Sequence, residues 1–358
     1  MNALIVGGGI GGLCAAVALA RAGIEVDVFE RAAELQEAGA GLTLWGNALA
    51  ALDSLGLGEL RRMGSPLTGV VYRSDGRVLL SVSSARQAAM GGPAVALHRA
   101  DLQRTLIDHL GAARLTLASP CTGVTRHASG VVAHVGGRDC PGDVLVGADG
   151  LHSVVRAQLH GARPPVYAGY TAWRGVTDWR GGDVRPGETW GRGARFGRVP
   201  IGGGRLYWFA TKNVAEGRRS PDGEQAELRR TFRGWHAPIE ALIEATAETA
   251  ILRSDIYDRP VISRWSAGRV TLLGDAAHPM TPNLGQGACQ AIEDAVALAK
   301  CLREGGPADA ALRCYEQARA PRANAFVRRS RRLGRMAQWQ QPAAVWLRDA
   351  VVAAAGRL

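Results

Sequence analysis

The sequence predicts an α/β fold in which a parallel-sheet domain holds an inserted antiparallel-sheet domain and ends in C-terminal helices. Three observations predict it: a strand-helix-strand pattern opens the chain, two later apolar strands end in glycine-containing turns, and a tryptophan-rich middle section alternates apolar and polar residues. A chain of 358 residues that is 47% hydrophobic and 21% charged can fill the cores of two joined domains.

The first 30 residues are predicted to form a βαβ unit. An aliphatic run occupies 3–6, a stretch rich in alanine and leucine favours a helix until Gly23, and a second apolar run follows over 24–29. Such a crossover is right-handed by default, and its first strand is buried on both faces. The helix therefore begins directly after a glycine-rich turn.

That turn has the sequence Gly7-x-Gly9-x-x-Gly12. In this position Gly7 permits a tight turn, Gly9 lets the backbone approach a pyrophosphate, and Gly12 allows close packing of helix on strand. Glu30 ends the second strand where a carboxylate accepts from the hydroxyls of an unphosphorylated ribose, and Arg31 beside it is a further cofactor-binding candidate. The turn predicts a nucleotide site, as in FAD or NAD binding; a glycine-rich packing turn is the alternative.

The next elements are shorter. The pattern predicts helices at 46–63 and 98–110 and a hairpin at 70–82 around an Asp-Gly turn. Short strand-like runs then lead to an apolar strand within 143–150 and a helix that carries Arg156.

The turn at 147–156 is a second cofactor-binding candidate. Asp149 precedes a glycine there and can bind a backbone or cofactor hydroxyl, while Arg156 lies one helical turn further on and can steady it or meet a phosphate. A strand-ending turn with an arginine on the helix surface is the alternative.

The turn at 274–287, with the sequence GDAAHPMTPNLGQG, is the third candidate. Asp275 ends a buried strand and can accept from the ribityl hydroxyls of a flavin. Gly285 and Gly287 let the backbone approach a flat ring, so that helix-terminal amides stabilise negative charge on it. His278 is either a proton-transfer group or a structural hydrogen bonder that holds the loop.

The section from 163 to 265 holds six of the nine tryptophans and reads as an antiparallel sheet. Alternation along 205–210 puts Arg205, Tyr207 and Phe209 on one face and the three residues between and after them on the other, without deciding which face meets the cofactor. We expect Arg205 or Tyr207, with Trp173 and Arg174, to line a substrate pocket; sheet packing or a surface ion pair is the alternative for each.

These elements divide the chain into three parts. We expect the first domain over 1–162, with small β insertions at 69–98, and the antiparallel-sheet domain over 163–265. Residues 266–358 return to the first domain and supply the C-terminal helices.

The net charge of +11 is concentrated near the C-terminus, where 301–358 hold eleven arginines and four acidic residues. A solvated helix face is the expectation, and a patch for a membrane surface or an acidic partner is the alternative. No apolar run reaches the roughly 18 residues of a membrane helix, and no basic leader precedes the first apolar run. The six cysteines form no CxxC pair, which predicts neither disulfides nor a metal site and favours the cytoplasm.

The three turns, in this order and separation, resemble the motifs of the class A flavoprotein monooxygenases, the para-hydroxybenzoate hydroxylase-like family, and the resemblance covers almost the whole chain. It implies a Rossmann-like FAD-binding domain of that type with an inserted substrate domain. It also implies tightly held FAD, NADH or NADPH as transient reductant, and O2 as co-substrate. The implied reaction is hydroxylation or epoxidation of an electron-rich aromatic small molecule through a flavin C4a-hydroperoxide.

Within this family, the 274–287 loop and the strand at 204–212 are similar to those of bacterial urate hydroxylases, plant zeaxanthin epoxidases and natural-product hydroxylases. The resemblance implies that Arg99 contacts the flavin, that Arg205 contacts substrate, and that Pro282 and Asn283 belong to the substrate site. Asn283 departs from the aspartate of the urate enzymes, which puts urate in doubt as the substrate.

Two other readings stay open at this point. A flavin-dependent reductase or dehydrogenase of the same fold would use the same motifs without inserting oxygen. An FAD-holding sensor or a nucleic-acid binder would use the arginine-rich tail, although that tail has no recognised nucleic-acid module. We expect a small-molecule substrate and O2 as partners, no nucleic acid, no integral membrane segment, and a monomer or weak homodimer.

Overall fold

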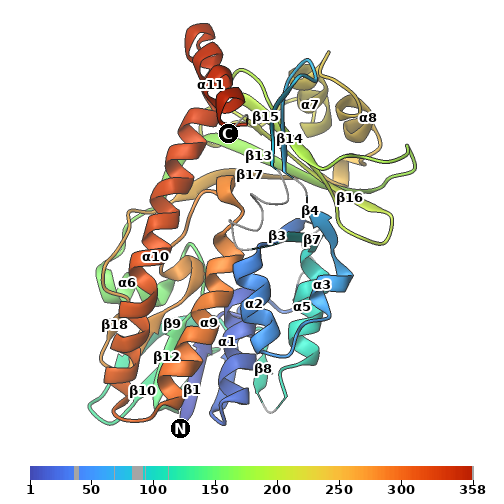
Figure 1. Cartoon of the computed structure of the whole chain (residues 1–358). Coiled ribbons are helices and arrows are strands. Elements are labelled where there is room, and N and C mark those ends of the chain that lie inside the picture. The colour runs from blue at the N-terminus through green and yellow to red at the C-terminus, as the bar shows by residue number, and fades with distance from the viewer. Residues whose placement is uncertain (36–39, 68, 83–91, 93, 112, 357–358) are drawn as a thin grey trace.

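The computed structural model describes residues 1–35, 40–67, 69–82, 92, 94–111 and 113–356. Figure 1 shows two sheet layers: the helix-covered parallel sheet in the lower half and a large antiparallel sheet in the upper half, with the long helix α10 (Ala308–Ala337) running beside both. The predicted α/β class with an antiparallel-sheet layer and C-terminal helices is confirmed.

The parallel sheet brings the ends of three distant strands together. Strand β1 pairs in parallel with β12, and β12 pairs in parallel with β19, so that Val6, Gly147 and Leu272 lie side by side. Each of the three predicted turns follows one of these strands, so all three meet at the carboxyl edge of the sheet, where open α/β sheets bind ligands. In sheet order the strands are β18 (Ser266–Ala267), β19 (Val270–Leu272), β12 (Val144–Gly147), β1 (Asn2–Val6), β2 (Glu25–Phe29) and β8 (Arg114–Thr116).

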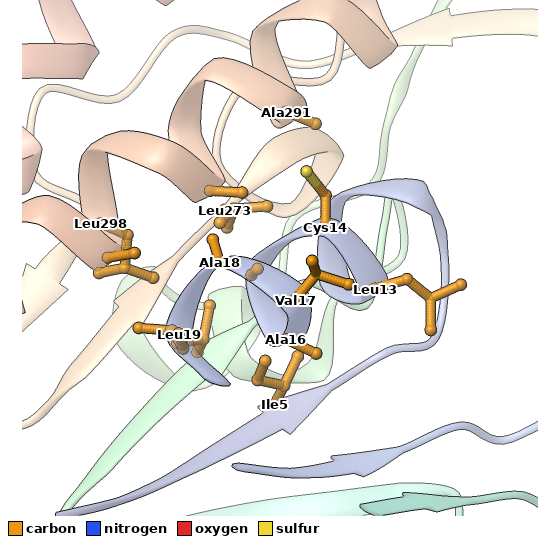
Figure 2. Close-up of a cluster of buried hydrophobic side chains, with 14 of the residues drawn as sticks. Ile5, Leu13, Cys14, Ala16, Val17, Ala18, Leu19, Leu273, Ala291 and Leu298 are labelled. Atoms are coloured by element: carbon orange, nitrogen blue, oxygen red, sulfur yellow. The ribbon is translucent and has the colours of Figure 1, made fainter. Parts of the chain in front are cut away.

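Helix α1 (Ile10–Arg21) is buried on most sides because alanine, leucine and valine occupy nearly every position. In Figure 2 its side chains point toward Ala291 and Leu298 of helix α9 (Gly287–Arg303) and toward Leu273 after β19. The first and third turns are therefore joined through one apolar core, which fixes their spacing at the sheet edge.

The seven-stranded sheet has one face in its own core and one face toward the edge of the parallel sheet. Leu206, Trp208 and Ala210 pack with helices α7 (Glu224–Phe232) and α8 (Ile239–Glu244), so the alternate residues point the other way. Its strands, in order, are β17 (Leu252–Asp258), β13 (Val166–Asp178), β16 (Arg205–Lys212), β15 (Ala194–Pro200), β14 (Gly187–Trp190), β5 (Val70–Arg73) and β6 (Val78–Ser81).

Two local predictions need correction. The hairpin predicted at 70–82 forms, but β5 pairs with β14 and so extends the large sheet instead of decorating the first domain. The rest of that expected insertion includes 83–91 and 93, which lie outside the described residues. The helix predicted at 46–63 is two helices, because Gly56 at φ 62° turns the chain between α2 (Gly46–Ser54) and α3 (Leu60–Met63).

Two smaller sheets and two further helices lie between residues 41 and 160. Helix α5 (Arg99–Asp108) matches the helix predicted at 98–110, and α6 (Val154–His160) carries Arg156 as expected. One small sheet has the strand order β11 (Arg138–Gly142), β10 (Val131–Val135) and β9 (Cys121–Arg126). The other has the order β3 (Gly41–Leu44), β7 (Ala94–His98) and β4 (Ser65–Leu67).

The C-terminal helices tie the two layers together. Helix α11 (Pro342–Ala355) is anchored by buried Arg348, which donates to the carbonyl oxygens of Gly191 and Ala337. On α10, Arg328, Arg332 and Arg335 are exposed, in keeping with a solvated face. No helix within the described residues has both the length and the apolar character to cross a membrane.

Candidate active site

A cavity of about 420 Å³ lies between the carboxyl edge of the parallel sheet and the inward face of the seven-stranded sheet. It has the size of a small-molecule site. The predicted site residues that line it are Gly9, Arg99, Arg174, Tyr207, Asp275, Pro282, Asn283, Gly285 and Gly287.

The three glycines of the first turn have different surroundings. Gly7 has φ 110°, and a Cβ added there would lie 2.4 Å from the Ala148 carbonyl oxygen, so the turn requires glycine. A Cβ on Gly12 would lie 1.9 Å from the Gly7 carbonyl oxygen. A Cβ on Gly9 would meet no atom within 4 Å, because Gly9 faces the cavity at the N-terminus of α1. The turn is therefore packed at both ends and open in the middle.

Glu30 and Arg31 stand behind this turn, outside the cavity lining. The Glu30 carboxylate accepts from the backbone N–H of Gly8 at 2.6 Å and of Ala32 at 2.9 Å. It therefore holds the glycine turn in shape and retains lone pairs for a hydroxyl donor. Arg31 is exposed.

Asp149 and Arg156 hold the second turn. One oxygen of Asp149 accepts from the backbone N–H of Val154 and Val155, whereas the other is buried without a hydrogen-bond partner among the described residues. Burial raises the pKa of Asp149, although these hydrogen bonds oppose the rise. Arg156 lies outside the lining and is not on the surface: it is buried, and burial lowers its pKa to about 10.

Arg156 links the second turn to the third. Its guanidinium donates to the carbonyl oxygens of Ala276 and Ala277, at 2.9 and 2.8 Å, just after the short helix η2 (Gly274–Ala276). Because these carbonyls stand beside Asp275, the arginine fixes the loop that turns the Asp275 carboxylate to the cavity. Desolvation raises the pKa of Asp275 although its side chain faces the cavity, and His278 and Arg99 act in the opposite direction.

His278 lies outside the cavity lining and is structural. It is 1% exposed, and its Nε2 lies 2.5 Å from Asp294 Oδ2 on α9. Arg319 on α10 donates to the other oxygen of Asp294 at 2.7 Å. The structure therefore favours the loop-holding role of His278 over the proton-transfer role.

The large sheet contributes the opposite wall. Tyr207, Phe209 and Thr211 of β16 line the cavity, as does Arg174 of β13, which also donates to Ser254 at 2.7 Å. Burial raises the pKa of Tyr207, and the neighbouring Arg174 opposes that rise. The inward face of the sheet is therefore the one that carries Tyr207 and Phe209.

The structure corrects two predicted substrate residues. Trp173 is 2% exposed and lies on the opposite face of β13 from Arg174, where its indole N–H donates to Glu224. Arg205 is on the cavity face, but at the end of β16 it pairs with Asp101 at 2.6 Å and does not line the cavity. Strand alternation separates Trp173 from Arg174, and the position along the strand removes Arg205.

Two charged cavity residues, Arg195 and Glu188, were not predicted from the sequence. Arg195 of β15 is 2% exposed and donates to Glu188 of β14 at 2.8 Å and to Asn283 at 2.6 Å. Arg195 and Glu188 both line the cavity. The available signal was alternation: Arg195 stands between Ala194 and Phe196, which face the apolar core, so its own side chain must face the other way.

These features fit an FAD molecule. Gly9 leaves open space at a helix N-terminus, and Asp275 lines the same cavity, whereas Asp149, with one oxygen buried without a partner among the described residues, lies outside the lining. The glycine turn and Glu30 would hold the nucleotide end. Gly285 and Gly287, at the start of α9, would face the ring.

Comparison with known proteins agrees with this geometry. The family model described as "FAD binding domain" matches residues 1–330. Aurachin C monooxygenase/isomerase of Stigmatella aurantiaca is 46% identical over 98% of this chain and 93% of its own length. The 2-heptyl-3-hydroxy-4(1H)-quinolone synthase of Pseudomonas aeruginosa is 37% identical over 98% and 94%.

A solved structure is also similar along nearly the whole chain. Klebsiella pneumoniae HpxO, crystallised with FAD and uric acid, has a TM-score of 0.91 and 31% identity, covering 99% of this chain and 93% of that one. The resemblance read from the three turns is thus confirmed: the chain belongs to the FAD-binding-domain family and is a class A FAD-dependent monooxygenase.

Proposed function

We propose that this enzyme uses NADH or NADPH and O2 to hydroxylate or epoxidise a planar nitrogen heterocycle that carries a ring carbonyl. The names of two relatives support this class: one is a 4(1H)-quinolone synthase, and the other was crystallised with uric acid. Both ligands are flat rings that present N–H donors and carbonyl acceptors.

The observation that carries the proposal is the pairing of Arg195 with Glu188 in the cavity wall. Arg195 can donate to a ring carbonyl, and the Glu188 oxygen that does not accept from Arg195 can accept from a ring N–H. Tyr207 and Phe209 offer flat surfaces for the ring. The wall therefore presents both partners that such a heterocycle needs.

When bound, FAD would supply the redox chemistry that links the nicotinamide, O2 and the substrate. The chain orients the two rings and keeps water out. The residues of the three turns that line the cavity would hold the flavin, and the β13–β16 wall would hold the substrate. The large sheet forms one wall of the cavity, and this wall would limit the water that releases hydrogen peroxide.

The proposal also includes the expected cellular location, domain division and oligomeric state. A cytoplasmic location is supported by the six cysteines, all of which are free thiols. We also keep the division at 163 and 265, apart from the β5–β6 hairpin, and the expectation of a monomer or weak homodimer.

Labelled oxygen tests the proposal. With 18O2, NADH or NADPH and a panel of quinolones, purines and benzoates, we expect the nitrogen heterocycles to stimulate nicotinamide oxidation and to gain one labelled oxygen atom. Product that forms without O2 would instead support a reductase of the same fold. Stimulation by benzoates alone would contradict the heterocycle class.

Replacing Arg174 by alanine is expected to raise the substrate KM by about tenfold, because a hydrogen bond to a charged donor is lost. Arg174 lines the cavity, whereas Arg205 pairs with Asp101 outside it. The matched Arg205→Ala variant is therefore expected to keep the wild-type KM. Steady-state kinetics of both variants measure this, and a raised KM for Arg205→Ala alone would return Arg205 to the site.

A further inference from the structure

We propose that one face at the end of helix α10, formed by Ser330, Gly334 and the C-cap residue Gln338, positions two residues of the cavity wall, Arg195 and Asn283. This inference rests on the proposed function, because it concerns how the cavity wall is held. The three residues are spaced by four positions, and the C-cap Gln338 still donates its backbone N–H to the Gly334 carbonyl, so they lie on one face. All three are buried.

Gly334 leaves the space that the Asn283 side chain occupies. A Cβ added to Gly334 would lie 2.2 Å from Asn283 Nδ2 and 2.9 Å from its Cγ. Glycine inside a helix lowers helix stability relative to alanine. The glycine in the interior of this 30-residue helix is therefore explained by packing, because the carboxamide of a cavity residue, Asn283, occupies the space beside it.

Ser330 fixes the direction of that carboxamide. Asn283 Nδ2 donates to the Ser330 carbonyl at 3.2 Å and to Thr281 Oγ1 at 2.9 Å. The Thr281 hydroxyl donates to Ser330 Oγ, and the Ser330 hydroxyl donates to the Thr281 carbonyl. The acceptors on this side leave the Asn283 oxygen facing the cavity.

That oxygen meets a group that can only donate. Arg195 Nη2 donates to Asn283 Oδ1 at 2.6 Å, and an arginine has no acceptor. An aspartate at 283 would turn a second acceptor toward the Ser330 carbonyl, so this network selects asparagine. Tyr170 lies within hydrogen-bond distance of both amide atoms.

Gln338 holds the same arginine from its other side. Its Oε1 accepts from Arg195 Nε at 2.8 Å and from Thr211 at 3.1 Å, and its Nε2 donates to Asn213. The guanidinium is therefore held at Nε by α10 and at Nη2 by Asn283, which α10 also holds. We infer that the geometry of Arg195 and Asn283 is set by a helix none of whose described residues lines the cavity.

The test is a double-mutant cycle on the holoenzyme. Gly334→Ala should raise the KM for a heterocyclic substrate by about tenfold, with FAD content and melting temperature retained. In the Asn283→Ala background the added methyl group has room, so the same substitution should change KM by less than about twofold. Equal effects in both backgrounds would overturn the proposal, since Gly334 would then act by another route.

Two further variants separate positioning from general damage. Arg335→Ala, on the exposed side of the same helical turn, should leave KM unchanged. Gln338→Leu removes the acceptor for Arg195 and should raise KM with kcat less affected. If Gln338→Leu matches wild type, Gln338 does not position Arg195.

A crystal structure of Gly334→Ala gives a readout that needs no substrate. The Asn283 carboxamide should move away from α10 and lose its bond to Arg195. An unmoved carboxamide overturns the positioning inference even if the enzyme turns over heterocycles. A wild-type enzyme that turns over no heterocycle would refute the proposed function instead, and the crystal structure would still decide the role of Gly334.

Discussion

Replacing Gly9 by alanine is expected to weaken FAD binding by about 10- to 100-fold while leaving the apoprotein as stable as the wild type. Gly9 has an extended backbone conformation, with φ −74° and ψ 178°, that alanine adopts without strain. Its added Cβ would meet no protein atom within 4 Å but would enter the space at the helix N-terminus that the pyrophosphate needs. The affinity is measured by titrating apoprotein with FAD and following flavin fluorescence.

The same methyl group at Gly12 is the matched comparison. There it would lie 1.9 Å from the Gly7 carbonyl oxygen, a backbone atom that moves only if the turn moves. Gly12→Ala should therefore lower the melting temperature of the apoprotein as well as the FAD content. Wild-type FAD affinity in the Gly9 variant would contradict the role of Gly9 in leaving space for the pyrophosphate, whatever the result for the Gly12 variant.

The cofactor half of the site could be predicted from the sequence because each of its parts is a local signal. A buried strand, a glycine turn and a helix N-terminus follow one another within fewer than twenty residues at each of the three turns, and their chemistry follows from that order. Parallel pairing of β1, β12 and β19 then brings Gly9 and Asp275 to one cavity. The three turns could therefore be identified in the sequence, and only their positions next to one another depend on the order of the strands.

The substrate half could be predicted only in part, because it depends on pairing between distant strands. Alternation correctly grouped Tyr207 with Phe209, yet the face of β13 that meets them is fixed by its register with β16, where Arg174 pairs with Phe209. The pattern alone places Trp173 and Arg174 on opposite faces of the strand but does not decide which of them meets the cavity. Alternation alone points Arg195 away from the apolar core, but its pairing with Glu188 becomes visible only when β14 and β15 are aligned.

Replacing Asp294 by alanine is expected to cost about 3–5 kcal/mol of folding stability, the range for breaking a buried ion pair from one side. Asp294 is fully buried and accepts from His278, from Arg319 and from the backbone N–H of Gly274. Without it the Arg319 guanidinium loses its fully buried partner, and the third turn loses its anchor to α9. The melting temperature of the apoprotein and its FAD affinity should therefore fall together.

The stability difference between wild type and this variant should also depend on pH. Burial tends to raise the pKa of Asp294, but His278 and Arg319 outweigh it and hold the pKa below its ordinary value of 3.8. A carboxylate whose folded pKa is lowered contributes stability that is present above about pH 4 and is lost as the pH falls through the folded value. The difference should be constant near neutrality and shrink in acid, as measured by denaturant unfolding over a pH series.

The adjacent glutamate provides the control. Glu293 also pairs with Arg319, at 3.0 Å, but its side chain is 16% exposed and it shares its charge with the exposed Arg322. Solvent screens such a pair, so Glu293→Ala should cost no more than about 1 kcal/mol. If the two variants lost equal stability, the charge on Arg319 alone would explain both. A larger loss for Asp294→Ala means that the fully buried carboxylate also holds His278 and the third turn, which places part of the stability of the fold directly under the flavin site.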